Sequence, residues 1–290
     1  MDLSGAVIAR GRGPASNPTR IGFDAAAAAV KQAAEATLAS LEDPAHVVAL
    51  CAGLAGTAQS QNRDRIERLL EEKFSGVRIT VCTDLDLALA AVPDGPAIVL
   101  VVGTGSAAVG RDGAGRQLRE GGYGPSGSDE GSGFDIGRSA VRAARTQTAG
   151  DESVKLSRQI LRHLGFLDWA AVDAQASVAA DDVYPRVFPV VAASADAGNS
   201  LAQSVLNDAA QKLAAITLRL AQTLGIADIK FPVRKAGGTV GRSQFFDQAL
   251  DAQLRAKLPN AMIEAAPAEA AETAARIALR HALNQEGAAL

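Results

Sequence analysis

The sequence lacks the features that mark several large classes of protein. Its 29 Lys and Arg residues are balanced by 32 Asp and Glu residues, and no cluster of basic residues forms a binding face for nucleic acid. The longest strongly apolar stretch, residues 97–110, is interrupted by glycines and is too short to cross a bilayer. No charged and then apolar signal segment opens the chain. We therefore expect a cytoplasmic protein that binds neither nucleic acid nor a membrane.

Cysteine and histidine are scarce as well. The two cysteines, Cys51 and Cys82, lie in apolar runs typical of strands, which favours buried, reduced thiols over a disulfide or a reactive pair. The three histidines are scattered, and neither H-E-x-x-H nor C-x-x-C occurs. We expect no structural metal.

Strand-like and helix-like segments alternate along the chain, which predicts an α/β fold with parallel strands. Before the turn "PDGP" at residues 93–96, we expect strands over 5–13, 46–56 and 77–84 and helices over 23–43, 62–74 and 85–92. After it, we expect a strand, a glycine turn and a hairpin at "DGAG", then helices, a strand at 228–238, a helix from about Ser243 and a terminal helix. The "PDGP" turn is a predicted hinge between two domains.

A glycine turn, "GTGS", directly follows the apolar strand that starts the second domain. Backbone N–H groups in such turns often hold phosphates, and Thr104 and Ser106 add hydroxyls. The motif is not the dinucleotide-binding G-x-G-x-x-G, because its spacing differs and a strand rather than a helix is expected to follow. It is not a P-loop either, because no Gly-Lys dipeptide occurs. A phosphate-binding turn and an ordinary tight hairpin are both open at this point.

The segment "GGYGPSGSDEGSGFDIGR", residues 121–138, holds seven glycines and three acidic residues ahead of a predicted helix. Its glycines allow the backbone to approach a ligand closely, and its acids favour hydroxyl groups over an anion. The alternative is that Ser128 or Asp129 caps the helix while Glu130 complements its dipole.

Four further residues, Asp84, Asn17, Gly237 and Gly238, carry candidate chemistry. Asp84 ends a predicted strand, where open α/β sheets place functional groups, although it could instead cap the next helix. Asp86 is interpreted as a solvated acid of the first helical turn. Asn17 could bind a ligand or form an Asx turn before Pro18. Gly237 and Gly238 could let a flat ring lie against backbone, or form an ordinary turn between strand and helix.

In their order along the chain, the stretches "GRGPASNP", "CAGLAG", "VCTD", "VVGTGS", "GGYGPSGSDEGSGFDIG" and "AGG" resemble the N-acetylglucosamine kinase and BadF/BadG/BcrA/BcrD ATPase family of the sugar kinase, Hsp70 and actin superfamily. The resemblance implies two ribonuclease H-like (actin-like ATPase) domains with a cleft between them. It places residues 1–95 and the C-terminal helix 269–290 in the first domain and residues 96–268 in the second.

The resemblance also implies an activity, the ATP-dependent phosphorylation of the 6-hydroxyl of N-acetylglucosamine or a related amino sugar such as glucosamine. Asp84 resembles the general base of such kinases. Mg-ATP is the implied co-substrate, and a homodimer is the implied assembly. The implied contacts to sugar are Asn17, Thr104, Gly122, Tyr123 and Asp129, those to phosphates are Gly103, Thr104, Gly105 and Ser106, and those to adenosine are Gly237 and Gly238.

The sequence departs from the family pattern at its start. The family opens with a strand and a D-G-G-G-T-x-T turn for phosphates and Mg²⁺, and this chain begins at what should be the second strand. We expect that Met1 is an internal methionine and that the inner strand is encoded upstream. Two other functions stay open, an ATPase that drives electrons from an iron–sulfur cluster into an acyl-CoA dehydratase, and a non-catalytic sugar-binding pseudokinase.

Overall fold

The computed structural model describes residues 1–41, 45–124, 128–146, 151–265 and 270–286. The chain divides into two compact units, residues 1–93 with 267–290 and residues 94–266. The division falls in the "PDGP" turn. No helix in the described part of the chain is both long and apolar enough to cross a membrane.

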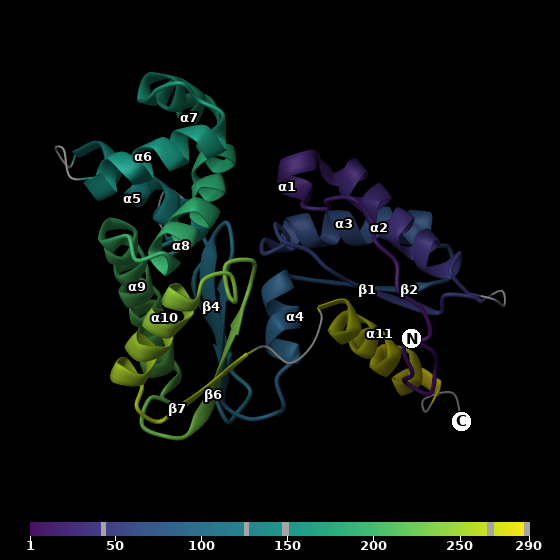
Figure 1. Cartoon of the computed structure of the whole chain (residues 1–290). Helices are drawn as coiled ribbons and strands as arrows, with labels where there is room; N and C mark the ends of the chain where they lie inside the picture. The colour runs from purple at the N-terminus through teal and green to yellow at the C-terminus, as the bar shows by residue number, and fades with distance from the viewer. Residues whose placement is uncertain (42–44, 125–127, 147–150, 266–269, 287–290) are drawn as a thin grey trace. The chain divides into compact units, whose positions relative to one another are not determined.

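The first unit is built on two parallel strands, β1 (Ala49–Gly53) and β2 (Arg78–Cys82), joined by helix α3 (Ser60–Lys73). Helices α2 (Phe23–Leu38) and α3 cover one face of this pair, where Ile66, Leu70 and Val81 are part of one apolar cluster. Helix α11 (Ala270–Glu286) packs on both strands and on the short helix α4 (Asp84–Ala90) (Figure 1). A four-residue helix, α1 (Pro18–Ile21), precedes α2.

The strand expected over residues 5–13 is not present, and the backbone of these residues forms neither strand nor helix. The end of the segment instead runs along α2: a Cβ added to Gly11 would lie 2.7 Å from the Ala33 carbonyl oxygen, and one added to Gly13 would lie 2.8 Å from that of Ala29. Alternating apolar residues predict a strand only where a neighbouring strand can supply hydrogen bonds. Here the apolar side chains of Val7 and Ile8 are exposed.

The cysteines also differ from expectation. Cys51 and Cys82 are half-buried rather than buried, and their sulfur atoms lie 3.8 Å apart across β1 and β2. The sequence could not show this contact because the two residues are 31 positions apart in the chain.

The second unit contains a five-stranded sheet in the order β5-β4-β3-β6-β7. Its strands are β3 (Ala97–Val102), β4 (Ser106–Arg111), β5 (Gln117–Gly121), β6 (Phe231–Ala236) and β7 (Ala261–Ala265). The pairs β3–β4 and β4–β5 are antiparallel, whereas β3–β6 and β6–β7 are parallel. The hairpin expected at "DGAG" joins β4 to β5. Strand β7, at the sheet edge, was not expected, since its five residues carry little strand pattern.

Helices complete this unit. The long helix α9 (Ser200–Leu224) lies along β3, β4 and β5, and its buried residues Leu206, Leu213 and Leu220 recur every seven positions. Asn199 caps its start by accepting a hydrogen bond from the Ala202 N–H. The remaining helices are α5 (Gly133–Thr146), α6 (Asp151–Leu164), α7 (Trp169–Val183), the 3₁₀ helix η1 (Tyr184–Val187), α8 (Phe188–Asp196) and α10 (Gln244–Lys257).

Candidate functional site

The glycine turn between β3 and β4 is fixed against the start of α5. The Gly133 N–H donates to the Gly103 carbonyl at 2.8 Å, and the Phe134 N–H donates to the Thr104 carbonyl at 3.1 Å. The N–H groups at the start of the helix are thus taken by the turn rather than left for an anion. Within the described residues, the N–H groups of Thr104 and Gly105 have no hydrogen-bond partner. They are the donors that this turn can offer to a phosphate.

The second glycine turn lies beside the first. Strands β3 and β6 are parallel neighbours, so both turns follow carboxyl ends at the same edge of the sheet. The Thr239 N–H and hydroxyl both donate to the Val102 carbonyl, at 3.1 and 2.8 Å. Gly237 has a φ of +105°, and a Cβ there would lie 2.3 Å from the Val102 oxygen, so only glycine fits this position.

The acidic loop reaches the same edge through Asp129. Its Oδ1 accepts a hydrogen bond from the Ser106 N–H at 3.3 Å, and a Cβ added to Gly105 would lie 2.9 Å from it. Burial raises the pKa of the Asp129 carboxyl, and the negative charge of Asp181 raises it further, against the lowering effect of the Ser106 N–H. A half-buried carboxylate therefore lies directly beside the glycine turn.

Ser106 has a different role from the phosphate contact that the sequence implied. It is buried, its N–H donates to Asp129, and its hydroxyl donates to the Glu130 carbonyl at 2.8 Å. Both donors of Ser106 are used to hold the acidic loop.

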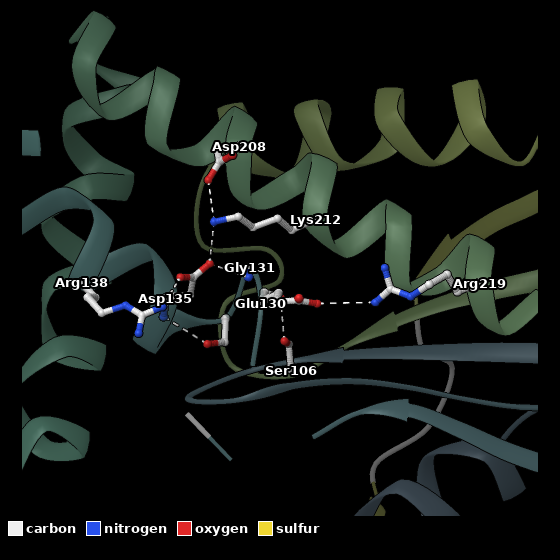
Figure 2. A network of polar contacts seen from close by, with 9 residues as sticks. Ser106, Glu130, Gly131, Asp135, Arg138, Asp208, Lys212 and Arg219 are labelled. Carbon is white, nitrogen blue, oxygen red and sulfur yellow. Dashed lines mark hydrogen bonds and ion pairs between the residues drawn. The ribbon is translucent and has the colours of Figure 1, made fainter. Parts of the chain in front are cut away.

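A network of charged groups on helices α5 and α9 holds the acidic loop in place (Figure 2). The Asp135 carboxylate accepts from the Gly131 N–H at 3.0 Å and pairs with Lys212 of α9 at 3.0 Å and with Arg138 at 3.1 Å. Burial alone would raise the pKa of Asp135, but the Gly131 and Lys212 contacts hold it below its ordinary value. Lys212 also pairs with Asp208 at 2.7 Å. The network ties the loop to two helices.

The residue that caps α5 differs from the two candidates that the sequence suggested, Ser128 and Asp129. Ser132 Oγ accepts from the Asp135 N–H at 3.2 Å, so Ser132, rather than Ser128 or Asp129, caps the helix. Glu130 pairs with Arg219 of α9 at 3.5 Å. Asp129 is therefore not needed for helix capping. The Ser132-x-x-Asp135 spacing in the sequence is typical of a capping box and could have predicted this cap. No local pattern could have predicted that Lys212 pairs with Asp135.

The rim of the loop carries Gly122 and Tyr123. The Tyr123 ring is exposed, and the Arg119 guanidinium lies 4.3 Å from its centroid. The Tyr123 N–H donates to Ser128 Oγ at 2.7 Å, and the Gly122 N–H donates to the Ser128 carbonyl at 3.3 Å. Residues 125–127, which include Gly127 of the predicted glycine run, lie outside the described part of the chain.

The other two candidates, Asn17 and Asp84, belong to the first unit. Asn17 caps α1: its Oδ1 accepts from the Thr19 N–H at 3.0 Å, the alternative role considered for it. A Cβ added to Gly56 would lie 2.5 Å from the same oxygen, so Asn17 faces the loop after β1. The side chain thus has a structural partner on each side.

Asp84 is the exposed first residue of α4, immediately after β2. The cap of α4 is Thr83, whose Oγ1 accepts from the Asp86 N–H at 3.0 Å, and the Asp86 carboxylate accepts from the Thr83 N–H at 2.9 Å. This capping box corrects two assignments, since Asp84 is not the cap and Asp86 is not merely solvated. The structure thus brings together seven predicted residues of the second unit, Gly103, Thr104, Gly105, Ser106, Asp129, Gly237 and Gly238.

The described residues contain no group of three or more His, Cys, Asp and Glu side chains placed to hold a metal ion. Magnesium that arrives with a nucleotide is usually held by one or two carboxylates together with phosphates and water, so it does not require such a group.

Known proteins are similar to this chain in sequence and in fold. The sequence matches the BadF/BadG/BcrA/BcrD ATPase family over residues 1–278. It is 24% identical over 282 residues to the N-acetyl-D-glucosamine kinase of Dictyostelium discoideum, covering 91% of this chain and 88% of that protein. It is 28% identical over 202 residues to the N-acetylmuramic acid/N-acetylglucosamine kinase of Clostridium acetobutylicum, covering 68% of this chain and 66% of that protein.

Solved structures agree with the sequence match. A candidate N-acetylglucosamine kinase from Chromobacterium violaceum has a TM-score of 0.74 and 25% identity, covering 94% of this chain and 90% of that one. A ROK family glucokinase from Streptomyces griseus, solved with glucose and AMPPNP, has a TM-score of 0.57 and 16% identity, covering 91% and 89%. The fold is the mixed α/β, two-domain fold of these kinases. Because the family match extends over almost the whole sequence, the chain belongs to the BadF/BadG/BcrA/BcrD ATPase family.

Proposed function

We propose that the chain is an ATP-dependent kinase that phosphorylates the 6-hydroxyl of N-acetylglucosamine or a related amino sugar. One observation carries the proposal, the placement of a half-buried carboxylate, Asp129, directly beside the glycine turn at Gly103–Gly105. A carboxylate recognises hydroxyl groups and a glycine turn recognises phosphates, so their contact supports a site where a sugar meets a phosphate. The names of the relatives support the same substrate class.

The proposed nucleotide site is the pair of glycine turns. The N–H groups of Thr104 and Gly105 would hold phosphate oxygens, and the backbone of Gly237 and Gly238 would lie against adenosine. The distance of 3.9 Å between a Cβ added to Gly103 and the Gly238 nitrogen supports the view that one ligand contacts both turns. Mg²⁺ would arrive with ATP and neutralise charge on its phosphates.

The proposed sugar contacts are the Asp129 carboxylate, the Thr104 hydroxyl, Asn17 and the loop backbone at Gly122 and Tyr123. A buried carboxylate discriminates strongly, because a sugar that lacks the matching hydroxyl leaves it unpaired. Tyr123 is the exposed aromatic surface of this loop, and an aromatic ring suits the apolar face of a sugar.

Asp84 is the proposed general base. Its carboxylate would take the proton of the sugar 6-hydroxyl while that oxygen attacks the γ-phosphorus, and the bond to the β-phosphate oxygen would break to release ADP. Its position directly after β2, where open α/β sheets place functional groups, supports this role, and Thr83 and Asp86 form the capping box of α4. A homodimer and a cytoplasmic location stay predictions.

The test is an ADP-release assay of the full chain with Mg-ATP and a panel of sugars. N-acetylglucosamine, glucosamine and N-acetylmuramic acid should stimulate ADP release, and 6-deoxy-N-acetylglucosamine should not. Sugar binding without ADP release would favour the pseudokinase, and ADP release that ignores every sugar would favour the electron-driving ATPase. An iron analysis of the purified protein separates that second case further, since the cluster requires iron.

A further inference from the structure

The two cysteines of the chain meet in the folded protein. Cys51 lies in β1 and Cys82 in β2, and their sulfur atoms are 3.8 Å apart, within the distance at which one thiol can donate a hydrogen bond to the other. No other cysteine occurs in the sequence. The contact lies in the first unit, outside the candidate site of the second unit, and β2 leads from Cys82 directly to the proposed base Asp84.

The pair lies on the α11 face of the two strands. Cys51 is paired in register with Thr80, and paired residues of neighbouring strands point to the same face. The Thr80 hydroxyl contacts His281 Nδ1 of α11 at 2.9 Å, which identifies that face. Both cysteines are half-buried.

The two thiols are chemically unequal. The hydrogen bond from Cys82 lowers the pKa of the Cys51 thiol, although burial opposes this shift. The same hydrogen bond, followed by burial and by the charges of Cys51 and Asp86, raises the pKa of the Cys82 thiol. Cys51 is therefore the better thiolate, and Cys82 is a protonated neighbour in position to react second.

We propose that Cys51 and Cys82 form a site of reversible covalent modification, in which they exchange with a low-molecular-weight disulfide such as oxidised glutathione and end as an intramolecular disulfide. The Cys51 thiolate attacks one sulfur of the oxidant, which forms a mixed disulfide and releases one glutathione thiolate. The Cys82 sulfur attacks the Cys51 sulfur, the bond between Cys51 and glutathione breaks, and the second glutathione thiolate leaves and takes up the proton that Cys82 gives up. The protein is oxidised by two electrons, and the glutathione disulfide is reduced to two thiols.

In the second step the two sulfur atoms, 3.8 Å apart in the reduced protein, must come into bonding distance. A disulfide bond is about 2.0 Å long, so the sulfur atoms must approach by roughly 2 Å. Cys51 lies opposite Thr80 and Cys82 lies opposite Gly53, so the two cysteines are diagonal neighbours, and closing the bond requires side-chain rotation together with a small shift of the strands. Both partners are held by the parallel pairing of β1 with β2, so the second thiol is already beside the first.

The experiment uses the full, reduced, natively folded chain treated with oxidised glutathione and measured by intact-protein mass spectrometry. The wild type should lose two hydrogens, a fall of about 2 Da, and lose both alkylatable thiols, and dithiothreitol should restore them. Cys82→Ser should stop at one glutathione on Cys51. Stable glutathione adducts on the wild type, unreacted thiols in the folded chain, or a disulfide between two chains would each overturn the proposal.

A matched pair of variants tests the unequal roles. Cys82→Ser keeps a hydroxyl that can donate to the Cys51 thiolate, whereas Cys82→Ala does not. Glutathione should therefore add to Cys51 severalfold faster in Cys82→Ser than in Cys82→Ala, and Cys51→Ser should react more slowly than either. Equal rates in the three variants would overturn the assignment of Cys51 as the attacking thiol, and far-UV circular dichroism checks that each variant is folded.

Discussion

Asp84 is the proposed general base, whereas the neighbouring residues Thr83 and Asp86 form the capping box of α4. If it is the general base, Asp84→Asn should lower kcat by roughly 10²–10⁴-fold, the usual contribution of general acid–base catalysis. Sugar affinity should change little, and the capping box of Thr83 and Asp86 should stay formed. Steady-state kinetics and thermal unfolding measure both.

Asp86→Asn is the matched control for that variant. It weakens the capping box and should cost about 0.5–2 kcal/mol of stability while kcat changes little. The role of Asp84 as the base is excluded if the two variants show the reverse pattern, with Asp84→Asn active and unstable and Asp86→Asn stable and inactive.

Asp129 should show a conflict between stability and binding. Its folded pKa is raised by burial and by Asp181, so it favours the folded state at low pH, and that contribution is lost as the pH rises through the folded pKa. Asp129→Asn keeps an acceptor for the Ser106 N–H and removes the charge. Its Tm should exceed that of wild type at neutral pH and converge with it at pH values below the Asp129 pKa.

The same variant should bind N-acetylglucosamine about 10- to 100-fold more weakly by calorimetry, because a neutral amide replaces a charged acceptor. Asp112→Asn provides a control of opposite sign. Desolvation opposes the shift, but the N–H groups of Arg116 and Ala114 lower the Asp112 pKa, so its loss should reduce the Tm at neutral pH without affecting sugar. Unchanged sugar affinity in Asp129→Asn would remove Asp129 from the sugar site.

At the scale of elements, helices α5 and α9 hold the acidic loop through Asp135. Asp135→Asn breaks its pairs with Lys212 and Arg138, and, because both partners are partly solvated, the cost should be about 1–3 kcal/mol. A loosened loop should raise the KM for sugar more than it lowers kcat. Denaturant unfolding and steady-state kinetics measure the two effects.

Arg145→Gln is the control on the same helix, since it removes the pair with Asp173, which lies outside the network. The double variant Asp135→Asn/Lys212→Met completes a thermodynamic cycle that isolates the Asp135–Lys212 coupling. If Arg145→Gln and Asp135→Asn change the KM for sugar equally, the effect comes from the stability of α5 in general and not from the contacts by which Asp135 holds the acidic loop.

Local signals in the sequence were sufficient for most elements. Strands β1, β2, β3 and β6, the β4–β5 hairpin and helices α2, α3, α9 and α11 appear where hydrophobic periodicity predicts them. The segment over residues 5–13 was wrongly predicted, because its apolar residues Val7 and Ile8 are exposed and its glycines Gly11 and Gly13 lie against α2 instead of pairing with a strand. Strand β7 is short and at an edge, so its pattern is weak.

The candidate site was predictable only in part, for a physical reason. The glycine turns and Asp129 are signalled by residue type next to a strand or helix, and the structure places them together. Lys212, 77 positions from Asp135, and the Cys51–Cys82 contact arise from tertiary packing alone. Ser106 looked like a phosphate contact because local sequence shows a hydroxyl but not what that hydroxyl already binds.

At the scale of the whole molecule, the proposed roles fall in both compact units. The proposed base, Asp84, belongs to the first unit, and the glycine turns with Asp129 belong to the second. Asp84→Asn should therefore bind Mg-ATP and sugar yet transfer no phosphate at a useful rate, while Asp129→Asn should fail at the sugar-binding step. The two variants thus test the two proposed steps separately.

The central claim is that the protein transfers the γ-phosphate of ATP to the 6-hydroxyl of an amino sugar. The most direct measurement is two-dimensional ¹H–³¹P NMR of the product formed from Mg-ATP and N-acetylglucosamine by the full chain. The account predicts a new phosphomonoester signal that correlates with the protons on carbon 6. Inorganic phosphate as the only phosphorus product besides ADP, or a phosphoester that correlates with the proton on carbon 1, would contradict it.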